Sequence, residues 1–303
     1  MARIENLSDQ SPSSIKIFLS FFRLGLTAFG GPAMIAYIKE LAVKKNKWLD
    51  EERFKDGVVF CQSIPGATAI QMAAYIGFGL PAFIFMLLFS TLYAGYHRLG
   101  FVQSLFAGLQ VIVVAIIAQA TYSFGRSIAN SYQNIIIAVL SAASLGLGSS
   151  PFLVIPGAGL AGIILLRNIK SPPLATDRKV EQWKIIPIIA LLLILFTGLA
   201  VLYFFNFEAF ILSTLMMKIY LFAFGGGFTS LPLMLHEVVG IRGWMDSKTF
   251  MDDIALGQVT PGPIVITAAF VGYLLQGFGG SLVAMISIFT PSFFNIDHYR
   301  SLL

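Results

Sequence analysis

Long apolar runs without ionisable side chains dominate the pattern of hydrophobic and polar positions along the chain. No Asp, Glu, Lys, Arg or His occurs in residues 99–125, 127–166 or 185–207. The first and third runs exceed the ~20 residues that a helix needs to cross the hydrocarbon core of a bilayer. The second run is long enough for two short crossings joined near residues 148–151. This pattern predicts an all-α, polytopic helical membrane protein.

Four short blocks of sequence occur twice, at an offset of 195 residues for the first block and 196 for the other three. The blocks pair Ala28-Phe29-Gly30-Gly31-Pro32 with Ala223-Phe224-Gly225-Gly226-Gly227, Trp48-Leu49-Asp50 with Trp244-Met245-Asp246, Phe54 and Asp56 with Phe250 and Asp252, and residues 62–66 with 258–262. Two related halves with Gly/Pro-interrupted apolar segments are typical of secondary transporters. We therefore divide the chain into a polar N-terminal tail (1–14), a first repeat (15–166), a basic linker (167–184) and a second repeat (185–303).

Composition and charge agree with a membrane protein, and the distribution of charge indicates which loops face the cytoplasm. The chain is 57% hydrophobic and 12% charged, whereas a soluble domain has about 25% charged residues. Six Lys and Arg residues lie in 39–55 and five in 167–184, beside apolar runs, which indicates cytoplasmic loops and not a nucleic-acid partner. The repeat-2 equivalent of the first loop, residues 236–250, has only Arg242 and Lys248. We therefore expect the two loops on opposite sides of the bilayer, which makes the repeats inverted.

Glycine and proline interrupt the apolar segments at matching places in the two halves. An unsatisfied peptide group in hydrocarbon is costly, so such breaks occur where the backbone is buried in protein or lines a wet cavity. Close helix packing is the alternative use of such glycines. Their recurrence after a phenylalanine favours a substrate-binding role. The candidates are Phe29, Gly30, Gly31 and Pro32 in one half and Phe224, Gly225, Gly226 and Gly227 in the other.

A second pair of breaks follows a glutamine in each half. Residues after a proline break begin a new helix, whose free N–H groups and positive dipole end favour an anion. A glutamine amide can donate to an oxyanion, although a helix–helix hydrogen bond is the alternative, and Thr68, Thr260 and Thr267 would add hydroxyl donors. The candidates are Gln62, Pro65 and Gly66, and Gln258, Pro261, Gly262 and Pro263.

Two cations occupy equivalent positions, each five residues before the Ala-Phe-Gly-Gly block. They are Arg23 and Lys218. A cation inside a span costs about 2.5–3.5 kcal/mol on insertion scales, which makes it a candidate for function. The alternative is a side chain that extends to the interface, which Lys218 could do easily. A guanidinium offers a planar fork of donors suited to an oxyanion, and we predict substrate contact for both residues.

The acids and histidines leave a coupling role open but predict no metal site. A proton-coupling role is open for Glu237 or Asp252, with His236 as a pH-sensitive neighbour. The alternative for Asp252, as for Asp56, is an acid that opens the helix leading to the Pro-Gly break, where the dipole favours it. The three histidines are scattered and Cys61 is the only cysteine. We expect no metal, no other cofactor and no enzyme activity.

Together these motifs resemble the chromate ion transporter family. Residues 24–32 look like its opening signature, and residues 258–263 and Thr290-Pro291-Ser292-Phe293 look like its second-half motifs. The resemblance covers nearly the whole chain from about Ile17. It implies a carrier in a bacterial-type cytoplasmic (inner) membrane that exports chromate, a sulfate-like dianion, and confers chromate resistance. The cationic position of the family's first signature helix falls on Arg23.

Two differences between the halves leave other functions open. Gly272 and Pro291 are 19 residues apart, whereas Gly77 and Pro81 are only four apart, and the first half continues further beyond its motif than the second. The alternatives are a truncated, non-transporting relative, a subunit that needs a partner chain, and a carrier of another dianion such as sulfate or molybdate. The expected partners are an oxyanion and the lipid bilayer, with a homodimer or a complementing chain left open.

Overall fold

The computed structural model describes residues 14–27, 34–46, 51, 54, 69–128, 131–165, 185–224 and 227–294. Every regular element within these ranges is helical, which confirms the predicted all-α fold. The helices are α1 (Ser14–Thr27), α2 (Met34–Lys39), η2 (Glu40–Lys45), α4 (Ala69–Tyr96), α5 (Gly100–Ile128), α6 (Tyr132–Gly146), α7 (Pro151–Leu165), α8 (Ile185–Phe205), α9 (Phe207–Phe222), α10 (Gly227–Met234), η3 (Leu235–Ile241), α11 (Ser247–Val259), η4 (Ile264–Ile266) and α12 (Thr267–Phe294). Of these, η2 and η3 are π-helices and η4 is a 3-10 helix.

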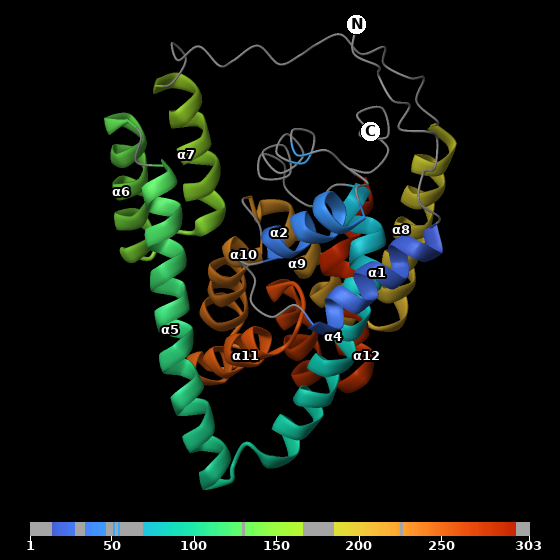
Figure 1. The fold of residues 1–303 in the computed structure, drawn as a ribbon. Coiled ribbons are helices and arrows are strands. Elements are labelled where there is room, and N and C mark those ends of the chain that lie inside the picture. The colour runs from blue at the N-terminus through green and yellow to red at the C-terminus, as the bar shows by residue number, and fades with distance from the viewer. Residues whose placement is uncertain are drawn as a thin grey trace, which may run out of the picture.

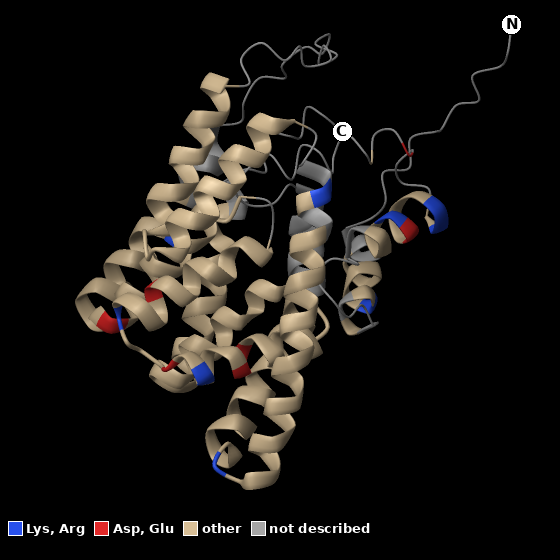
Figure 2. Cartoon of the chain, turned by 90° about the vertical axis from the view of Figure 1, so that its left-hand side faces the viewer, with Lys and Arg blue, Asp and Glu red and all other residues tan. Residues whose placement is uncertain are grey.

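Helices α4 and α5 form two arms that diverge from the turn at residues 97–99 (Figure 1). They have 28 and 29 residues, which corresponds to about 42 Å of helix against a hydrocarbon core of ~30 Å. Within the described ranges, three stretches are long and apolar enough, by length and composition, to cross a membrane, namely Gly79–Tyr96, Gly100–Tyr122 and Ile264–Pro291. Most of the helical ribbon in Figure 2 carries no charge. These features are those of a polytopic membrane protein.

Helices α6, α7 and α8 lie at the periphery. The predicted pair of short crossings corresponds to α6 and α7, which pack together and are joined at residues 147–150, where Gly148 has a positive φ of 86°. Large apolar side chains on these outer helices are exposed, among them Leu153 at 75% and Phe205 at 86%. Such exposure is expected where the surrounding solvent is lipid and not water.

The two halves share an order of elements. In each, a helix (α1 or α9) is followed by a short helix that widens into a π-helix, α2 with η2 or α10 with η3. The π-helices begin at Glu40 and Leu235, which are 195 positions apart, as are the first sequence blocks. Helix α1 packs along α4, α9 packs along α12, and α4 packs against α12. The inversion of one half relative to the other stays a prediction.

Helix α12 is bent and is not one straight crossing. Gln276 (φ −141°, ψ 27°) and Gly277 (φ 60°, ψ −146°) are not helical. A Cβ built on Gly272 or on Gly280 would overlap the carbonyl oxygen of the other, so the two segments cross backbone to backbone. The first segment, residues 267–275, is about 13 Å long, too short to cross. The 15 extra residues of the second half therefore contribute to a folded-back helical pair.

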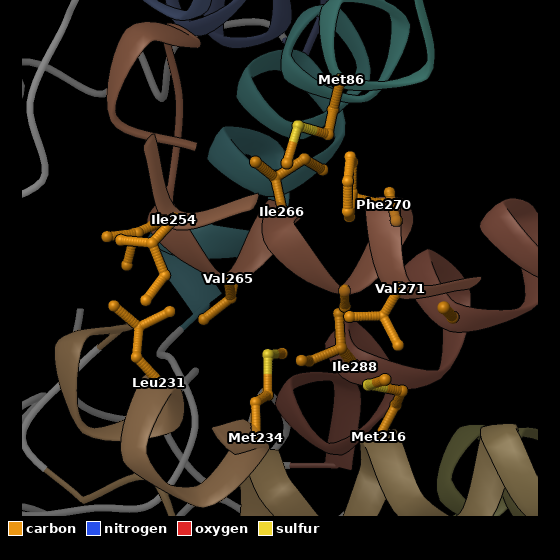
Figure 3. Packing of buried hydrophobic residues seen from close by; sticks show 14 of the residues in the cluster. Met86, Met216, Leu231, Met234, Ile254, Val265, Ile266, Phe270, Val271 and Ile288 are labelled. Atoms are coloured by element: carbon orange, nitrogen blue, oxygen red, sulfur yellow. The ribbon is translucent and has the colours of Figure 1, made fainter. Parts of the chain in front are cut away.

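The buried core lies where the second half meets α4 (Figure 3). Met86 of α4 lies near Ile266 and Phe270, while Met216 of α9 and Met234 of α10 point toward Val271 and Ile288 of α12. All of these side chains and the neighbouring Val265 are at most 3% exposed. This packing holds η4 and the start of α12 in a fixed position beside α10.

Candidate functional site

The structure describes most of the second-half part of the predicted site and one residue of the first-half part. Arg23, Lys218, Phe224, Gly227 and residues 258–263 lie within the described ranges. The predicted site residues outside them are Phe29, Gly30, Gly31, Pro32, Gln62, Pro65, Gly66, Gly225 and Gly226. The described part of the candidate site therefore belongs mainly to the second half.

Both predicted breaks of the second half interrupt helices. Helix α9 ends at Phe222, Ala223 has non-helical angles (φ −79°, ψ 65°), and α10 begins at Gly227. Helix α11 ends at Val259, and the chain resumes as η4 only at Ile264. Because residues 260–263 are outside any helix, the proline-containing segment acts as the predicted turn.

The two breaks lie in contact. A Cβ on Gly227 would be 2.7 Å from Cγ2 of Ile264 and 3.4 Å from Cγ1 of Val265, so the start of α10 approaches η4 more closely than any other residue type allows. Similarly, a Cβ on Gly257 would be 2.7 Å from Cγ2 of Thr267. The start of α10 thus lies against η4, and the end of α11 lies against the start of α12.

The polar side chains at the second break differ in their hydrogen bonding. The hydroxyl of Thr260 donates to the carbonyl of Leu256 at 2.8 Å, and that of Thr267 donates to the carbonyl of Ile264 at 3.0 Å. Each hydroxyl has one proton, so neither supplies the donor expected of it in this conformation. In contrast, Nε2 of Gln258 is buried without a hydrogen-bond partner in the described part of the chain.

Lys218 is paired with an acid across the first break. Its Nζ lies 2.6 Å from Oε1 of Glu237, whose side chain is only 8% exposed, and 3.9 Å from the centre of the Phe152 ring. Nε of Arg242 lies 3.7 Å from Oε2 of the same glutamate. Two cations thus face one carboxylate. The sequence predicted both Lys218 and Glu237 as functional residues but missed their pairing, because they lie on different helices.

Asp252 does not open its helix, contrary to the alternative considered from the sequence. Helix α11 begins at Ser247, and its N-cap is Asp246, which accepts a 2.7 Å hydrogen bond from the backbone N–H of Thr249. Hydrogen bonds from Thr249 lower the pKa of Asp246. Asp252 lies further along the helix and accepts hydrogen bonds from the Tyr93 hydroxyl and from Nε2 of Gln110, both at 2.8 Å. It therefore connects α11 to the two arms of the first half.

Asp253 is a buried acid that the sequence reasoning missed. It is 0% exposed, and neither carboxylate oxygen has a hydrogen-bond partner among the residues described. Its equivalent in the first half, 196 positions earlier, is Gly57. A search for features shared by the two halves therefore could not find it, although an acid inside an otherwise apolar helix is itself a signal.

The remaining described candidates are Arg23, Phe224 and His236. Arg23 is exposed on α1, the first-half counterpart of the helix that carries Lys218. Phe224 is 41% exposed beside the first break, and His236 is partly buried on η3. Within the described ranges, no group of three or more His, Cys, Asp and Glu side chains could hold a metal ion.

Comparison with known proteins places these features in a family context. The family model described as Chromate transporter matches residues 15–163 and 210–297. The chain is 44% identical over 300 residues to the uncharacterized transporter MJ0718 of Methanocaldococcus jannaschii, covering 93% of this chain and 75% of the relative. It is 30% identical over 299 residues to a probable chromate transport protein of Synechococcus elongatus (90% and 72% covered) and 28% identical over 313 residues to a chromate transport protein of Pseudomonas aeruginosa (95% and 73% covered). A comparison with the solved structures gave no match.

Proposed function

Because the chain belongs to the chromate transporter family, we propose that it is a secondary transporter that exports chromate across a cytoplasmic (inner) membrane. Transport would proceed by alternating access of two inverted halves around a central site. Chromate is a tetrahedral dianion, so the site needs hydrogen-bond donors and excess positive charge in a place where helices are interrupted.

The observation that carries this proposal is the unpaired amide donor of Gln258 beside two helix breaks in contact. Buried donors in native proteins nearly always have a partner, so an unpaired one points to a missing ligand. Nε2 of Gln258 has no partner within the described residues, and the turn at residues 260–263 follows it directly. Backbone N–H groups at the start of α10 would add donors for an oxyanion.

The charge of the Lys218 cluster supports an anionic substrate. Lys218 and Arg242 contribute two positive charges and Glu237 one negative charge, which leaves one excess positive charge. The side chain of Lys218 is still 47% exposed. We propose that Lys218 contacts the dianion while Glu237 holds the Lys218 side chain in position.

The first half would complete the site. Arg23 would face the substrate from α1, as Lys218 would from α9. The proposed substrate-binding residues of this half are Arg23, Phe29, Gly30, Gly31, Pro32, Gln62, Pro65 and Gly66, and those of the second are Lys218, Phe224, Gly225, Gly226, Gly227, Gln258, Pro261, Gly262 and Pro263.

Chromate uptake into everted membrane vesicles tests the proposal, because export from the cell becomes uptake in this orientation. Vesicles with the chain should accumulate chromate. Gln258→Met keeps the side-chain length but removes the donor, so it should lower apparent affinity roughly 10- to 150-fold, the equivalent of ~1.5–3 kcal/mol for a hydrogen bond to a charged group. Arg23→Gln should abolish uptake and Arg23→Lys should weaken it.

The control for each variant is its amount in the membrane, measured by immunoblot. Absence of chromate uptake by a well-inserted wild-type chain would contradict transport by this chain alone and favour a non-transporting relative or a subunit that needs a partner. Competition by sulfate and molybdate at equal concentration identifies the preferred dianion, since the proposed groups recognise charge and geometry and not the central atom.

A further inference from the structure

In the described part of the molecule, Asp253 is the buried side chain with the most polar atoms that lack a hydrogen-bond partner. Its carboxyl is 0% exposed, and both oxygens have no hydrogen-bond partner among the described residues. An ionised carboxylate without donors or a counter-ion is far more costly in such a place than the neutral acid, which has only a hydroxyl and a carbonyl to satisfy. The neutral acid is therefore the form that this environment tolerates.

Among the described residues, none of the charged or titratable groups on the surrounding helices donates a hydrogen bond to Asp253. The elements packed against α11 are α4, α5, η3, η4 and α12. Tyr93 of α4 donates to Asp252, and Glu237 of η3 is paired with Lys218 and Arg242. The other titratable groups on these elements and on α11 itself are Tyr75, Tyr96, Tyr122, Arg126, His236, Lys248 and Tyr273, and η4 has none.

Asp253 lies on the side of α11 that faces the second break. Residues four apart lie on one face of a helix, so Asp253 shares its face with Gly257. Gly257 contacts Thr267 at the start of α12, where its missing side chain allows close approach. The carboxyl is thus about one helical turn from the segment that follows Gln258 and leads into α12.

We propose that Asp253 is the proton-binding residue that couples oxyanion movement to proton movement. The inference rests on the proposed function. In one state of the cycle a proton from water forms an O–H bond with a carboxylate oxygen, and in another the same proton returns to water. A dianion at the adjacent break is disfavoured by an ionised Asp253 and tolerated by the neutral acid. Proton binding and oxyanion binding therefore promote each other by linkage.

A proton is favoured over a metal cation by the surroundings of the carboxyl. A hard cation needs several oxygen ligands, and the described residues contain no group of three acidic, histidine or cysteine side chains that could hold one. A proton needs only one carboxylate oxygen. Asp252, the neighbour predicted from the sequence, has both oxygens engaged by Tyr93 and Gln110, so we assign the coupling role to Asp253 instead.

The first experiment detects the proton itself. Infrared difference spectra of the full chain in lipid, wild type minus Asp253→Asn, should show the C=O stretch of a protonated carboxyl at neutral pH, shifted on exchange into D2O. The difference spectrum of Asp252→Asn should lack this band. A missing band in the Asp253 difference spectrum would overturn the proposal whether or not the chain transports chromate.

The second experiment measures coupling in liposomes that contain the full chain and a pH-sensitive dye. A chromate gradient should drive proton movement in the wild type, and Asp253→Asn should lose it. Asp252→Asn, the matched control, should retain the wild-type ratio of protons to chromate. Chromate itself takes up a proton in weakly acidic solution, and the Asp253→Asn sample subtracts that contribution.

The outcomes separate this inference from the proposed function. Chromate movement without proton movement in the wild type, or with a requirement for Na+ at constant pH, would overturn the coupling role and leave chromate transport standing. No chromate movement at all would overturn the proposed function and the coupling with it, with the infrared band still reporting on the protonated acid. If Asp253→Asn fails to fold, Asp253→Leu provides a second variant without a buried amide.

Discussion

Three buried acids of the second half have three different environments. Glu237 faces two cations, Asp252 accepts two hydrogen bonds from neutral groups, and Asp253 has no partner among the described residues. All three lie within 17 positions of one another along the chain. Their neighbours, and not their residue type, therefore decide which acid holds a charge, which one links helices and which one is suited to a proton.

The Lys218–Glu237 pair should contribute to stability as a unit. Lys218→Met leaves a buried carboxylate with only Arg242 at 3.7 Å, so we expect a loss of about 1–3 kcal/mol, less than for a fully buried pair because Lys218 is half-exposed. Adding Glu237→Gln should restore most of the loss. Thermal unfolding of the purified single and double variants measures the coupling.

The same variants separate stability from transport. If Lys218 contacts the dianion, the Lys218→Met/Glu237→Gln double variant should be stable but inactive. Additive losses of stability in the double variant would instead mean that the pair contributes nothing as a pair.

At the scale of elements, the bend of α12 depends on two glycines that touch. Gly280→Ala would place a methyl group against the carbonyl of Gly272, and we expect a destabilisation of at least ~2 kcal/mol by overpacking. Gly279→Ala is the matched control, since a Cβ there meets nothing within 4 Å and alanine is favoured over glycine in a helix by ~0.5–1 kcal/mol. Unfolding temperatures of the two variants measure the difference. Equal stability would argue against the close crossing.

The sequence predicts those elements whose causes are local. Uncharged apolar runs identify α5 and the α6–α7 pair, and the prolines at 261 and 263 identify the break before η4, because proline and long apolar stretches act through neighbouring residues. The residues around Gly277 that the second half has and the first half lacks mark the place where α12 bends. The resemblance of the motifs to the family is likewise local information.

Other features depend on contacts between distant segments and escape such reasoning. The π-helical turns of η2 and η3 have no distinctive composition. The partners of Asp252, Tyr93 and Gln110, are 159 and 142 positions away, and no spacing indicates them. Asp253 has no repeat counterpart, and its importance lies in an absence of donors that becomes visible only once the surrounding helices are in place.

At the scale of the whole molecule, the predicted inversion of the halves can be tested by labelling. Cys61 is the only cysteine, so Cys61→Ser provides a background for Lys45→Cys, at the end of η2, and Lys248→Cys, at the start of α11. Because basic loops remain in the cytoplasm, an impermeant maleimide should label Lys248→Cys in intact cells and Lys45→Cys only after permeabilisation. Labelling of both from the same side would contradict inverted halves.

The contact between α4 and α11 also limits when the molecule can finish folding during its synthesis. Tyr93 precedes its partner Asp252 by 159 residues, a delay of roughly 10–30 s at 5–20 residues per second. Lys218 precedes Glu237 by only 19 residues, so this ion pair forms almost at once. The buried face of α4 must therefore wait in the translocon or in lipid until the last described helices arrive. Synthesis speed and insertion machinery, and not only final stability, govern how much of this protein reaches its folded state.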